Sequence, residues 1–454
     1  MRFLESSLKE KWNNRALWRL LWPLITEQVL AVTIGIMDTV MVTSVGESAV
    51  SGVSIVDAIN MLLIITFSAL ATGGSVVVSQ FIGRRDEKRA RLSAKQLIYA
   101  SSVVSLLIML FTLPLRHPLL SLIYGQISTE VMHAAEIYFL LSALSYPSLA
   151  LYNAAASLFR STGNSRTPML IALMANLMNG GGNFLFIFGL KLGVMGAGIA
   201  TLASRTAAAL VLLVMLITDK KSPISLAGIF KVRLNGPIIK SILRVGVPSG
   251  LESSMFQVGK ILVSRIFTTF GTASIAANAV SGAINSFTFM PGNGFGIAIL
   301  TIAGQCAGAK DFESARYLTG KLMKLTYATV AGFSAIILLT MEPVIGLFDL
   351  SPEAALIAKH FLIIHCIISP LSWPSSFTLP NALRAAGDVR YCMVVAVASM
   401  WIVRVSFAYL FAYAFHMGPI GAWIAMVSDW CVRAVFFTSR WRSGRWRIKT
   451  VIQD

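Results

Sequence analysis

The stretch from Gln80 to Arg91 reads QFIGRRDEKRAR, and a related stretch at Gln305–Arg316 reads QCAGAKDFESAR. A shift of 225 residues superposes the two and brings further identical residues together: Pro23 on Pro248, Glu27 on Glu252, Thr43 on Thr268, Gly46 on Gly271 and Asn60 on Asn285. A shift of 224 superposes RSTGNSR at 160–166 on RAAGDVR at 384–390. The register continues over about 200 residues, which indicates that the chain consists of two similar halves.

The composition of the chain fits a membrane protein. Of its 454 residues, 56% are hydrophobic and only 13% are charged, and the mean hydropathy is +0.73, too apolar for a soluble domain. In lipid, a helical span needs about 20 mainly apolar residues, because the backbone must satisfy its own hydrogen bonds. We therefore expect an all-α transmembrane fold with twelve spans, at about 17–43, 49–80, 96–115, 131–158, 167–190, 194–217, 239–269, 274–305, 322–348, 354–383, 391–414 and 417–439.

The duplication and the twelve spans together predict the architecture. Each half has six spans, and because six is an even number the second half enters the membrane in the same sense as the first. Two parallel-repeat six-helix bundles of this kind enclose a central cleft and can rock against each other, as in secondary transporters. We expect an amino-terminal lobe at 1–217, a cytoplasmic linker at 218–238, and a carboxy-terminal lobe with a basic cytoplasmic tail at 239–454.

The net charge of +18 is distributed asymmetrically along the chain. Thirty of the 38 Lys and Arg residues lie in the terminal segments and in alternate loops, whereas only Arg116 and Lys191 lie in the loops between these. This positive-inside pattern places both termini and the basic loops in the cytoplasm of a multi-pass protein of the cell membrane. It argues against nucleic acid as a partner, because the charge forms no single patch. The first span lacks a small-residue cleavage site and is expected to remain as an anchor.

Ionisable residues at membrane depth are costly and usually face a water-filled cavity. Glu27 and Asp38 are eleven residues apart in the first span, which places them on nearly the same helix face, three turns apart. In the seventh span Glu252, the repeat counterpart of Glu27, shares a face with Gly259 and Lys260. Glu27, Asp38, Glu252 and Lys260 are therefore candidate cavity residues.

The alternative for such residues is a structural role. A charged side chain near a helix end reaches the headgroups, or it pairs with a neighbouring helix. This alternative is favoured for Asp57, Arg265, Lys359 and Arg433, which lie near predicted span ends. Arg433 is also four residues from Asp429, a spacing that predicts a local ion pair.

Two further features involve uncharged residues. Asn179 and Asn183 lie one turn apart in the fifth span, where their amides need partners and can serve either a cavity or helix packing. The tenth span contains Pro370, Pro374 and Pro380, which predict a bent helix.

Six short motifs resemble those of the multidrug and toxic compound extrusion (MATE) family, and the resemblance covers essentially the whole chain. The motifs are MDTVMV at 37–42, SQFIG at 79–83, FRSTGNSRTP at 159–168, PSGLESSMFQ at 248–257, GQCAG at 304–308 and LRAAGD at 383–388. The resemblance implies an antiporter, not an enzyme, that exports cationic or amphipathic organic compounds in exchange for H⁺ or Na⁺ by alternating access, without a cofactor.

The resemblance also implies roles for individual residues. Asp38 takes the place of the first-helix acid that binds the coupling ion, with Asn179 and Asn183 beside it, and these three residues would bind Na⁺ if Na⁺ is the ion. Glu252 matches the seventh-helix acid of the carboxy-terminal cavity. The tenth-helix acid of sodium-coupled members has no counterpart, since 370–387 contains no Asp or Glu. With Lys260 two turns from Glu252, this disfavours a sodium site in the second half and places coupling in the first.

Two other classes of function are alternatives to transport of this kind. A lipid-linked oligosaccharide flippase of the same superfold would line its cleft with Arg for pyrophosphate, and Arg205 and Arg404 keep that alternative open. A membrane enzyme would need a nucleophile–base pair or a metal set. The histidines in or near the spans (133, 360, 365, 416) form no shared helix-face set beyond 360 and 365, and the cysteines (306, 366, 392, 431) show no metal spacing. We expect a monomer that acts on a small organic molecule within the lipid bilayer.

Overall fold

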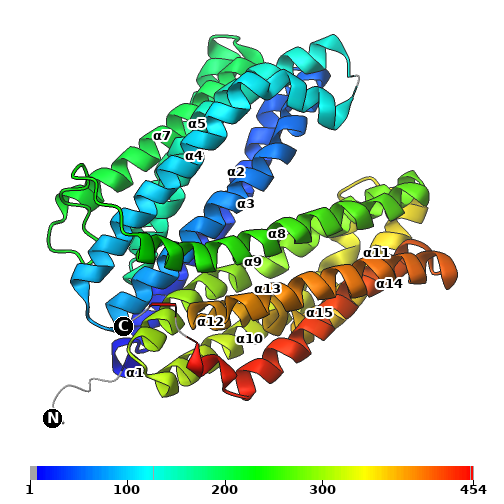
Figure 1. The fold of residues 1–454 in the computed structure, drawn as a ribbon. Helices are drawn as coiled ribbons and strands as arrows, with labels where there is room; N and C mark the ends of the chain where they lie inside the picture. Colours follow the sequence, from blue (N-terminus) through cyan, green and yellow to red (C-terminus); the bar gives the residue numbers. More distant parts are fainter. Residues whose placement is uncertain (1–7, 126, 450, 453–454) are drawn as a thin grey trace. The chain divides into compact units, whose positions relative to one another are not determined.

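The computed structural model describes residues 8–125, 127–449 and 451–452, and the long elements among them are all helices (Figure 1). Each of the twelve predicted spans coincides with a helix or with a run of helices joined by π-helical turns, which confirms the predicted fold class. By length and composition, ten of the described helices could cross a membrane. The elements are α1 (Leu8–Lys11), α2 (Asn14–Thr43), α3 (Glu47–Gly83), α4 (Glu87–Tyr124), α5 (Thr129–Ser161), α6 (Arg166–Asn183), η1 (Phe184–Gly189), α7 (Gly193–Thr218), α8 (Gly236–Thr269), α9 (Thr272–Gly308), α10 (Phe312–Gly346), α11 (Pro352–Trp373), η2 (Pro374–Thr378), α12 (Pro380–Ala385), α13 (Val389–Ala398), η3 (Ser399–Val405), α14 (Ser406–Tyr409), η4 (Leu410–Ala414), α15 (Gly418–Arg442) and η5 (Arg445–Ile448).

The third span is much longer than its apolar stretch predicts. We expected it at 96–115, but α4 runs for 38 residues and includes both Pro114 and Pro118. At 1.5 Å per residue such a helix is about 57 Å long, so it extends well beyond the roughly 30 Å hydrocarbon core. Arg116, which the sequence placed in a loop, therefore lies inside the helix, where its Nη1 donates to the Leu113 carbonyl oxygen at 3.0 Å.

The repeated QFIGRRD and QCAGAKD stretches form the same turn twice. Helices α3 and α9 end at Gly83 and Gly308, and the chain then passes through a left-handed residue, Arg85 at φ 60° or Lys310 at φ 58°. Next comes an aspartate whose side chain caps the following helix: Asp86 accepts from Arg89 N at 2.9 Å, and Asp311 accepts from Ser314 N at 3.0 Å. The most visible repeat in the sequence is therefore a helix–turn–helix.

Packing divides the chain into two compact units. The amino unit is Trp22–Gly250, and the carboxy unit is Met1–Leu21 together with Leu251–Asp454. The predicted linker at 218–238 belongs to the amino unit, where α4 binds it through Lys95 Nζ to the Ala227 carbonyl oxygen (2.6 Å) and Gln96 Nε2 to the Arg233 carbonyl oxygen (2.8 Å). The predicted lobe boundaries and the cytoplasmic placement of this segment stay predictions.

Each unit has a hydrophobic core of its own. In the amino unit Phe67 and Tyr146 pack with ring centroids 6.2 Å apart, in a cluster built from α2, α3, α4, α5 and α7. In the carboxy unit Phe361 stacks on Trp423 at 4.6 Å and 11°. Leu, Phe and Val side chains are also common among the exposed residues, as expected for helices whose outer faces contact lipid.

The tenth span is interrupted, as its prolines predict. Helix α11 changes at Pro374 into the π-helical turn η2, and α12 follows at Pro380. Comparable π-helical turns occur at the end of the fifth predicted span, at η1, and within the eleventh, at η3 and η4, although these turns contain no proline. π-Helical turns often mark functional sites, and η1 directly follows Asn183.

Candidate functional site

A cavity of about 560 Å³ lies inside the amino unit. Its volume is within the range of pockets that bind drug-sized molecules. Five helices contribute to its wall, each with one face: α2 gives Glu27, Ala31, Gly35, Asp38 and Val42; α3 gives Val50, Val53, Ser54, Asp57 and Ile64; α5 gives Tyr138, Leu149 and Tyr152; α6 gives Ala172, Ala175, Asn176, Asn179 and Asn183; α7 gives Ala197, Thr201, Ser204, Arg205 and Ala208.

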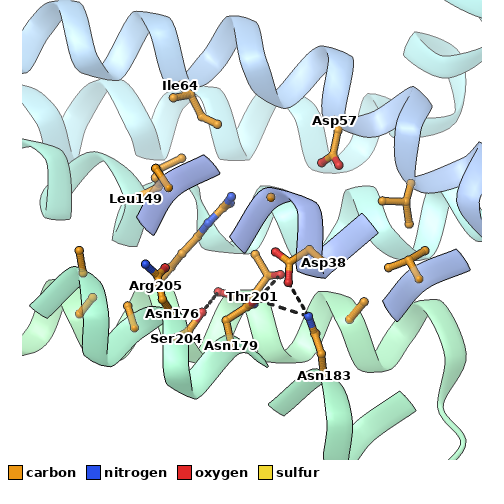
Figure 2. Close-up of a pocket in the computed structure, with 18 of the residues that line it drawn as sticks. Asp38, Asp57, Ile64, Leu149, Asn176, Asn179, Asn183, Thr201, Ser204 and Arg205 are labelled. Carbon is orange, nitrogen blue, oxygen red and sulfur yellow. Dashed lines mark hydrogen bonds between the residues drawn. The ribbon is translucent and has the colours of Figure 1, made fainter. Parts of the chain in front are cut away.

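The lining of the cavity confirms that Glu27 and Asp38 share a helix face. Every cavity residue of α2 is three or four positions from the next, the spacing of one stripe along a helix. The asparagines of α6 show the same spacing. Three of the candidate residues, Asp38, Asn179 and Asn183, come together within hydrogen-bond distance in this cavity (Figure 2).

Two amides bind the carboxylate of Asp38. Asn183 Nδ2 donates to Asp38 Oδ1 at 2.8 Å. The amide orientation that satisfies Asn179 places its nitrogen 2.7 Å from Asp38 Oδ1 and 3.2 Å from Oδ2, while its oxygen accepts from the Thr201 hydroxyl at 3.3 Å. Asp38 is half-buried, whereas Asn179 and Asn183 are buried. Donors on both amides match an ionised carboxylate, which is acceptor-only.

Asp57 and Arg205 belong to the same cavity. The sequence indicated Arg205 only under the flippase alternative and Asp57 only as a structural residue. The sequence favours a structural role for Asp57 near a span end, whereas in the structure its side chain lines the cavity, where Asn60 Nδ2 donates to its Oδ1 at 3.2 Å. Arg205 projects from α7 (Figure 2). Its Nη1 donates to Ser145 Oγ at 2.9 Å. The available signal was spacing, because Asp57 and Asn60 are three residues apart on one face of α3.

Glu27 is bound in an ion pair that the second half repeats. Arg160 Nη2 donates to Glu27 Oε1 in the amino unit, and Arg384 Nη2 donates to Glu252 Oε1 at 2.6 Å in the carboxy unit. The four residues are repeat counterparts, at shifts of 225 and 224. In both pairs the second carboxylate oxygen and the guanidinium Nε are buried with no partner among the described residues. The duplication has thus conserved a contact as well as a sequence.

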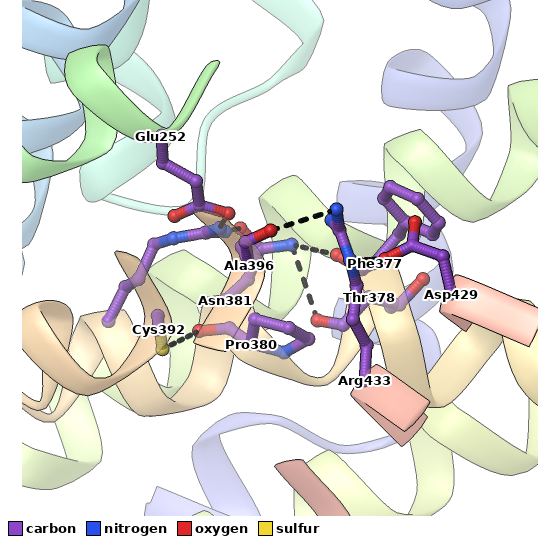
Figure 3. A network of polar contacts seen from close by, with 10 residues as sticks. Glu252, Phe377, Thr378, Pro380, Asn381, Cys392, Ala396, Asp429 and Arg433 are labelled. Carbon is purple, nitrogen blue, oxygen red and sulfur yellow. Dashed lines mark hydrogen bonds and ion pairs between the residues drawn. The ribbon is translucent and has the colours of Figure 1, made fainter. Parts of the chain in front are cut away.

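The carboxy unit extends this pair into a polar network (Figure 3). Arg384 Nη1 also donates to Asn381 Oδ1 at 3.0 Å, and Asn381 Nδ2 in turn donates to the carbonyl oxygens of Phe377 and Thr378, at 3.1 and 3.2 Å. Those two carbonyls belong to η2, so the π-helical turn supplies acceptors to the network. Glu252 is thereby connected to the bend of the tenth span.

Lys260 is not part of that network. Its side chain is exposed, and it forms no ion pair with any residue that the structure describes. Its neighbour Gly259 packs closely on η3, because an added Cβ there would lie 2.3 Å from Met400 Cε.

The predicted pair of Asp429 with Arg433 is confirmed at 2.8 Å, with both side chains buried. Ser399 Oγ also donates to Asp429 Oδ1 at 2.5 Å.

The charges that line the cavity of the amino unit are mainly negative. Three carboxylates, those of Glu27, Asp38 and Asp57, and one guanidinium, that of Arg205, belong to its wall. Arg160 pairs with Glu27. The other charges of the wall are therefore two carboxylates, those of Asp38 and Asp57, and one guanidinium, that of Arg205. Within the described residues, no three His, Cys, Asp or Glu side chains form a cluster that could bind a metal ion. An ion at Asp38 would instead take its oxygens from one carboxylate and the neighbouring amides.

The chain matches one family model twice. The model described as MatE matches residues 23–185 and again residues 248–410, and the second match lies 225 residues after the first, at the shift by which the sequence repeats. A Bacillus subtilis protein named uncharacterized transporter YisQ is 28% identical over 436 residues, which cover 95% of this chain and 94% of that protein. The probable multidrug resistance protein NorM of Thermotoga maritima is 26% identical over 448 residues, covering 97% of this chain and 94% of that protein.

A solved structure shows the same fold. It is described as the outward-facing conformation of a multidrug resistance MATE family transporter of the MOP superfamily. It superposes with a TM-score of 0.88 over 94% of this chain and 95% of that one, at 21% sequence identity. At that identity the likeness establishes the fold alone.

Proposed function

Because this chain belongs to the MatE family of multi-pass membrane transporters, we propose that it is a secondary active antiporter that exports cationic or amphipathic organic compounds in exchange for H⁺ or Na⁺. The observation that carries the proposal is Asp38, bound by the amides of Asn179 and Asn183 at the wall of a drug-sized cavity. Relatives of similar length are named as multidrug resistance proteins, which agrees with a cargo of this class.

The surroundings of Asp38 suit the reversible binding of an ion. An ionised Asp38 attracts a cationic compound into the cavity, and H⁺ or Na⁺ at the same carboxylate removes that attraction. Both ions can be accommodated by rotating an amide, because Asn179 and Asn183 present either a nitrogen donor or an oxygen acceptor. Ion and cargo then exclude each other, and each shifts the outward- and inward-facing populations through its differential affinity for the two states.

A lipid-linked oligosaccharide flippase is less consistent with this wall. Pyrophosphate is recognised by clustered guanidinium groups. Arg205 is a single guanidinium among three carboxylates, and its Nη1 already donates to Ser145. We further propose that the protein is a monomer of the cell membrane with both termini in the cytoplasm, and that it uses no cofactor.

The test is efflux of the cationic dye ethidium from proteoliposomes, with a pH gradient and a Na⁺ gradient imposed in separate experiments. We expect one gradient to drive efflux by the wild-type protein, which identifies the ion. Asp38→Asn keeps the shape of the side chain but removes its charge and its proton site, so efflux should fall to the passive leak under both gradients.

The matched control is Glu353→Gln, which removes an exposed carboxylate at the start of α11, outside the cavity. It should transport like the wild type. Gradient-driven efflux by Asp38→Asn at the wild-type rate would show that Asp38 is not the coupling residue, and absence of efflux by the wild type under both gradients would contradict antiport itself.

A further inference from the structure

A second hollow, of about 430 Å³, lies in the carboxy unit at the beginning of α2, whereas Asp38 lies near the end of that helix. We call it the basic pocket, and it is lined by Lys9, Trp12, Asn13, Asn14, Arg15, Tyr317 and Lys321. Three of these side chains are cationic, and none of the lining residues is acidic. We propose that the basic pocket binds a phosphate group, as carried by the headgroup of an anionic phospholipid.

Contacts of α10 with α1 and the start of α2 hold Lys9 and Lys321 at the pocket, which Arg15 also lines. Lys9 Nζ lies 4.3 Å from the ring centroid of Tyr317, and Lys321 Nζ donates to Asn14 Oδ1, so α1 and the start of α2 are bound to α10. Lys11, just outside the pocket, donates to Gln305 Oε1 at 2.9 Å and anchors the same segment to α9. Three like charges around one hollow repel one another, and a bound anion would offset that repulsion.

The backbone at this point also favours an anion. Asn13 caps α2, because its Oδ1 accepts from Ala16 N at 3.0 Å and its carbonyl oxygen accepts from Leu17 N at 2.9 Å. The first-turn N–H groups of Asn14 and Arg15 have no intrahelical acceptor, and the positive end of the helix dipole lies there. The amino terminus of a helix is a common phosphate site for this reason.

An independent observation comes from Trp12. The residue is 5% exposed, and its indole Nε1 is buried with no acceptor among the described residues. An indole N–H can only donate, and a buried donor without an acceptor is costly. Trp12 lines the basic pocket, so a phosphate oxygen that reached the indole there would supply the acceptor that the described residues do not.

The surroundings favour a lipid as the source of the phosphate. The pocket combines Trp and Tyr with Lys and Arg, the residue types that anchor proteins at the membrane interface. Its segment belongs to the basic side of the chain, which the charge pattern assigns to the cytoplasm, and the cytoplasmic leaflet carries the anionic lipids. The inference is separate from ion coupling, because it involves none of the residues of the amino unit.

The test measures binding by the full chain in detergent, through the shift of its thermal unfolding temperature during titration. The titrants are short-chain phosphatidylglycerol, short-chain phosphatidylcholine and inorganic phosphate. We expect saturable stabilisation by phosphatidylglycerol. The triple variant Lys9→Gln, Arg15→Gln and Lys321→Gln should weaken that binding by about tenfold or more, since each cation near an anionic headgroup contributes to affinity.

Two further variants keep the test decisive. Lys88→Gln, Lys220→Gln and Lys449→Gln together remove the same formal charge from exposed positions outside the pocket and should leave binding unchanged. Trp12→Phe keeps an aromatic ring but removes the indole N–H, so it should weaken binding while the chain still folds. Equal, variant-sensitive stabilisation by inorganic phosphate would support the phosphate site and assign its source to a soluble compound. No stabilisation by any titrant, or equal effects of the two triple variants, would overturn the proposal.

Discussion

At the scale of single residues, the two Glu–Arg pairs are the contacts with the clearest energetic consequence. Glu27 and Arg160 are 12% and 17% exposed, and Glu252 and Arg384 are 12% and 16% exposed. A charge so far removed from water depends on its partner, so removal of one partner leaves an uncompensated charge behind. Replacement of both partners by apolar residues removes the problem together with the pair.

We therefore expect Glu27→Leu to destabilise the protein by about 3 kcal/mol, and the double variant Glu27→Leu/Arg160→Leu to recover most of that loss. The order of stability of the wild type, the single variant and the double variant is measured by thermal unfolding of the purified proteins in one detergent. The repeat provides an internal replicate, because Glu252→Leu and Glu252→Leu/Arg384→Leu should follow the same order. If the double variants are as unstable as the single ones, the pairs are not what stabilises these side chains.

Site residues differed in how far the sequence could identify them. Asp38 was identifiable because it is an acid in the middle of an apolar stretch that also matches a family motif. Its binding to Asn179 and Asn183 joins α2 to α6, a contact across some 145 residues that no local pattern encodes. Asp57 lies near the start of an apolar stretch whose boundaries the sequence defines only loosely, whereas its position at the cavity depends on which face of α3 carries it.

At the scale of helices, α3 packs very closely on the first turns of α8 within the amino unit. An added Cβ at Gly73 would lie 2.4 Å from the Ile242 carbonyl oxygen and 2.9 Å from Gly246 N. Both obstacles are backbone atoms, which cannot rotate away as a side chain can. Small residues allow helices in a membrane to pack at this distance.

Gly73→Ala should accordingly separate α3 from α8 and cost about 1–3 kcal/mol, the usual range for overpacking. The control is Gly332→Ala in α10, where nothing lies within 4 Å of the added Cβ. There alanine should be neutral or stabilising by up to about 1 kcal/mol, because it forms helix better than glycine. The unfolding temperatures of the two variants should move in opposite directions or differ clearly, and equal effects would contradict the close packing.

Helix positions were far more predictable than helix interruptions. Twelve apolar stretches located twelve helical regions, because a chain that crosses lipid must form its backbone hydrogen bonds internally and therefore becomes helical there. Pro374 also located η2. The turn η3 has no proline, and it forms where Ser399 binds Asp429 of α15 and Met400 packs on Gly259 of α8. Such turns depend on tertiary contacts, which is why the sequence did not show them.

At the scale of the whole molecule, the two halves share a scaffold and differ in chemistry. The counterpart of Asp38 is Val263, which is buried in the hydrophobic cluster of the carboxy unit, and the counterpart of Gly35 is the exposed Lys260. The duplication, visible in the sequence, is confirmed by two matches to one family model. What the duplication alone could not reveal is that the Glu–Arg pair was kept in both halves while the acid at Asp38 was kept in one.

The parallel arrangement of the two repeats predicts on which side of the membrane equivalent helix ends lie. Thr129 and Glu353 are exposed at the starts of α5 and α11, and Lys88 and Glu313 are exposed at the starts of α4 and α10, so each pair occupies equivalent positions in the two halves. If the repeats are parallel, the members of a pair lie on the same side of the membrane. The positive-inside pattern assigns Lys88 and Glu313 to the cytoplasm and Thr129 and Glu353 to the outside.

Single cysteines at these four positions test both statements. Cys306, Cys366 and Cys392 are buried and only Cys431 is exposed, so a Cys431→Ser background suffices. We expect a membrane-impermeant maleimide to label Thr129→Cys and Glu353→Cys in intact cells, and to label Lys88→Cys and Glu313→Cys only after the membrane is opened. The reverse pattern would contradict the orientation but keep the parallel repeat. Opposite labelling of Thr129→Cys and Glu353→Cys would contradict the parallel repeat, because an odd number of crossings would then separate the two halves.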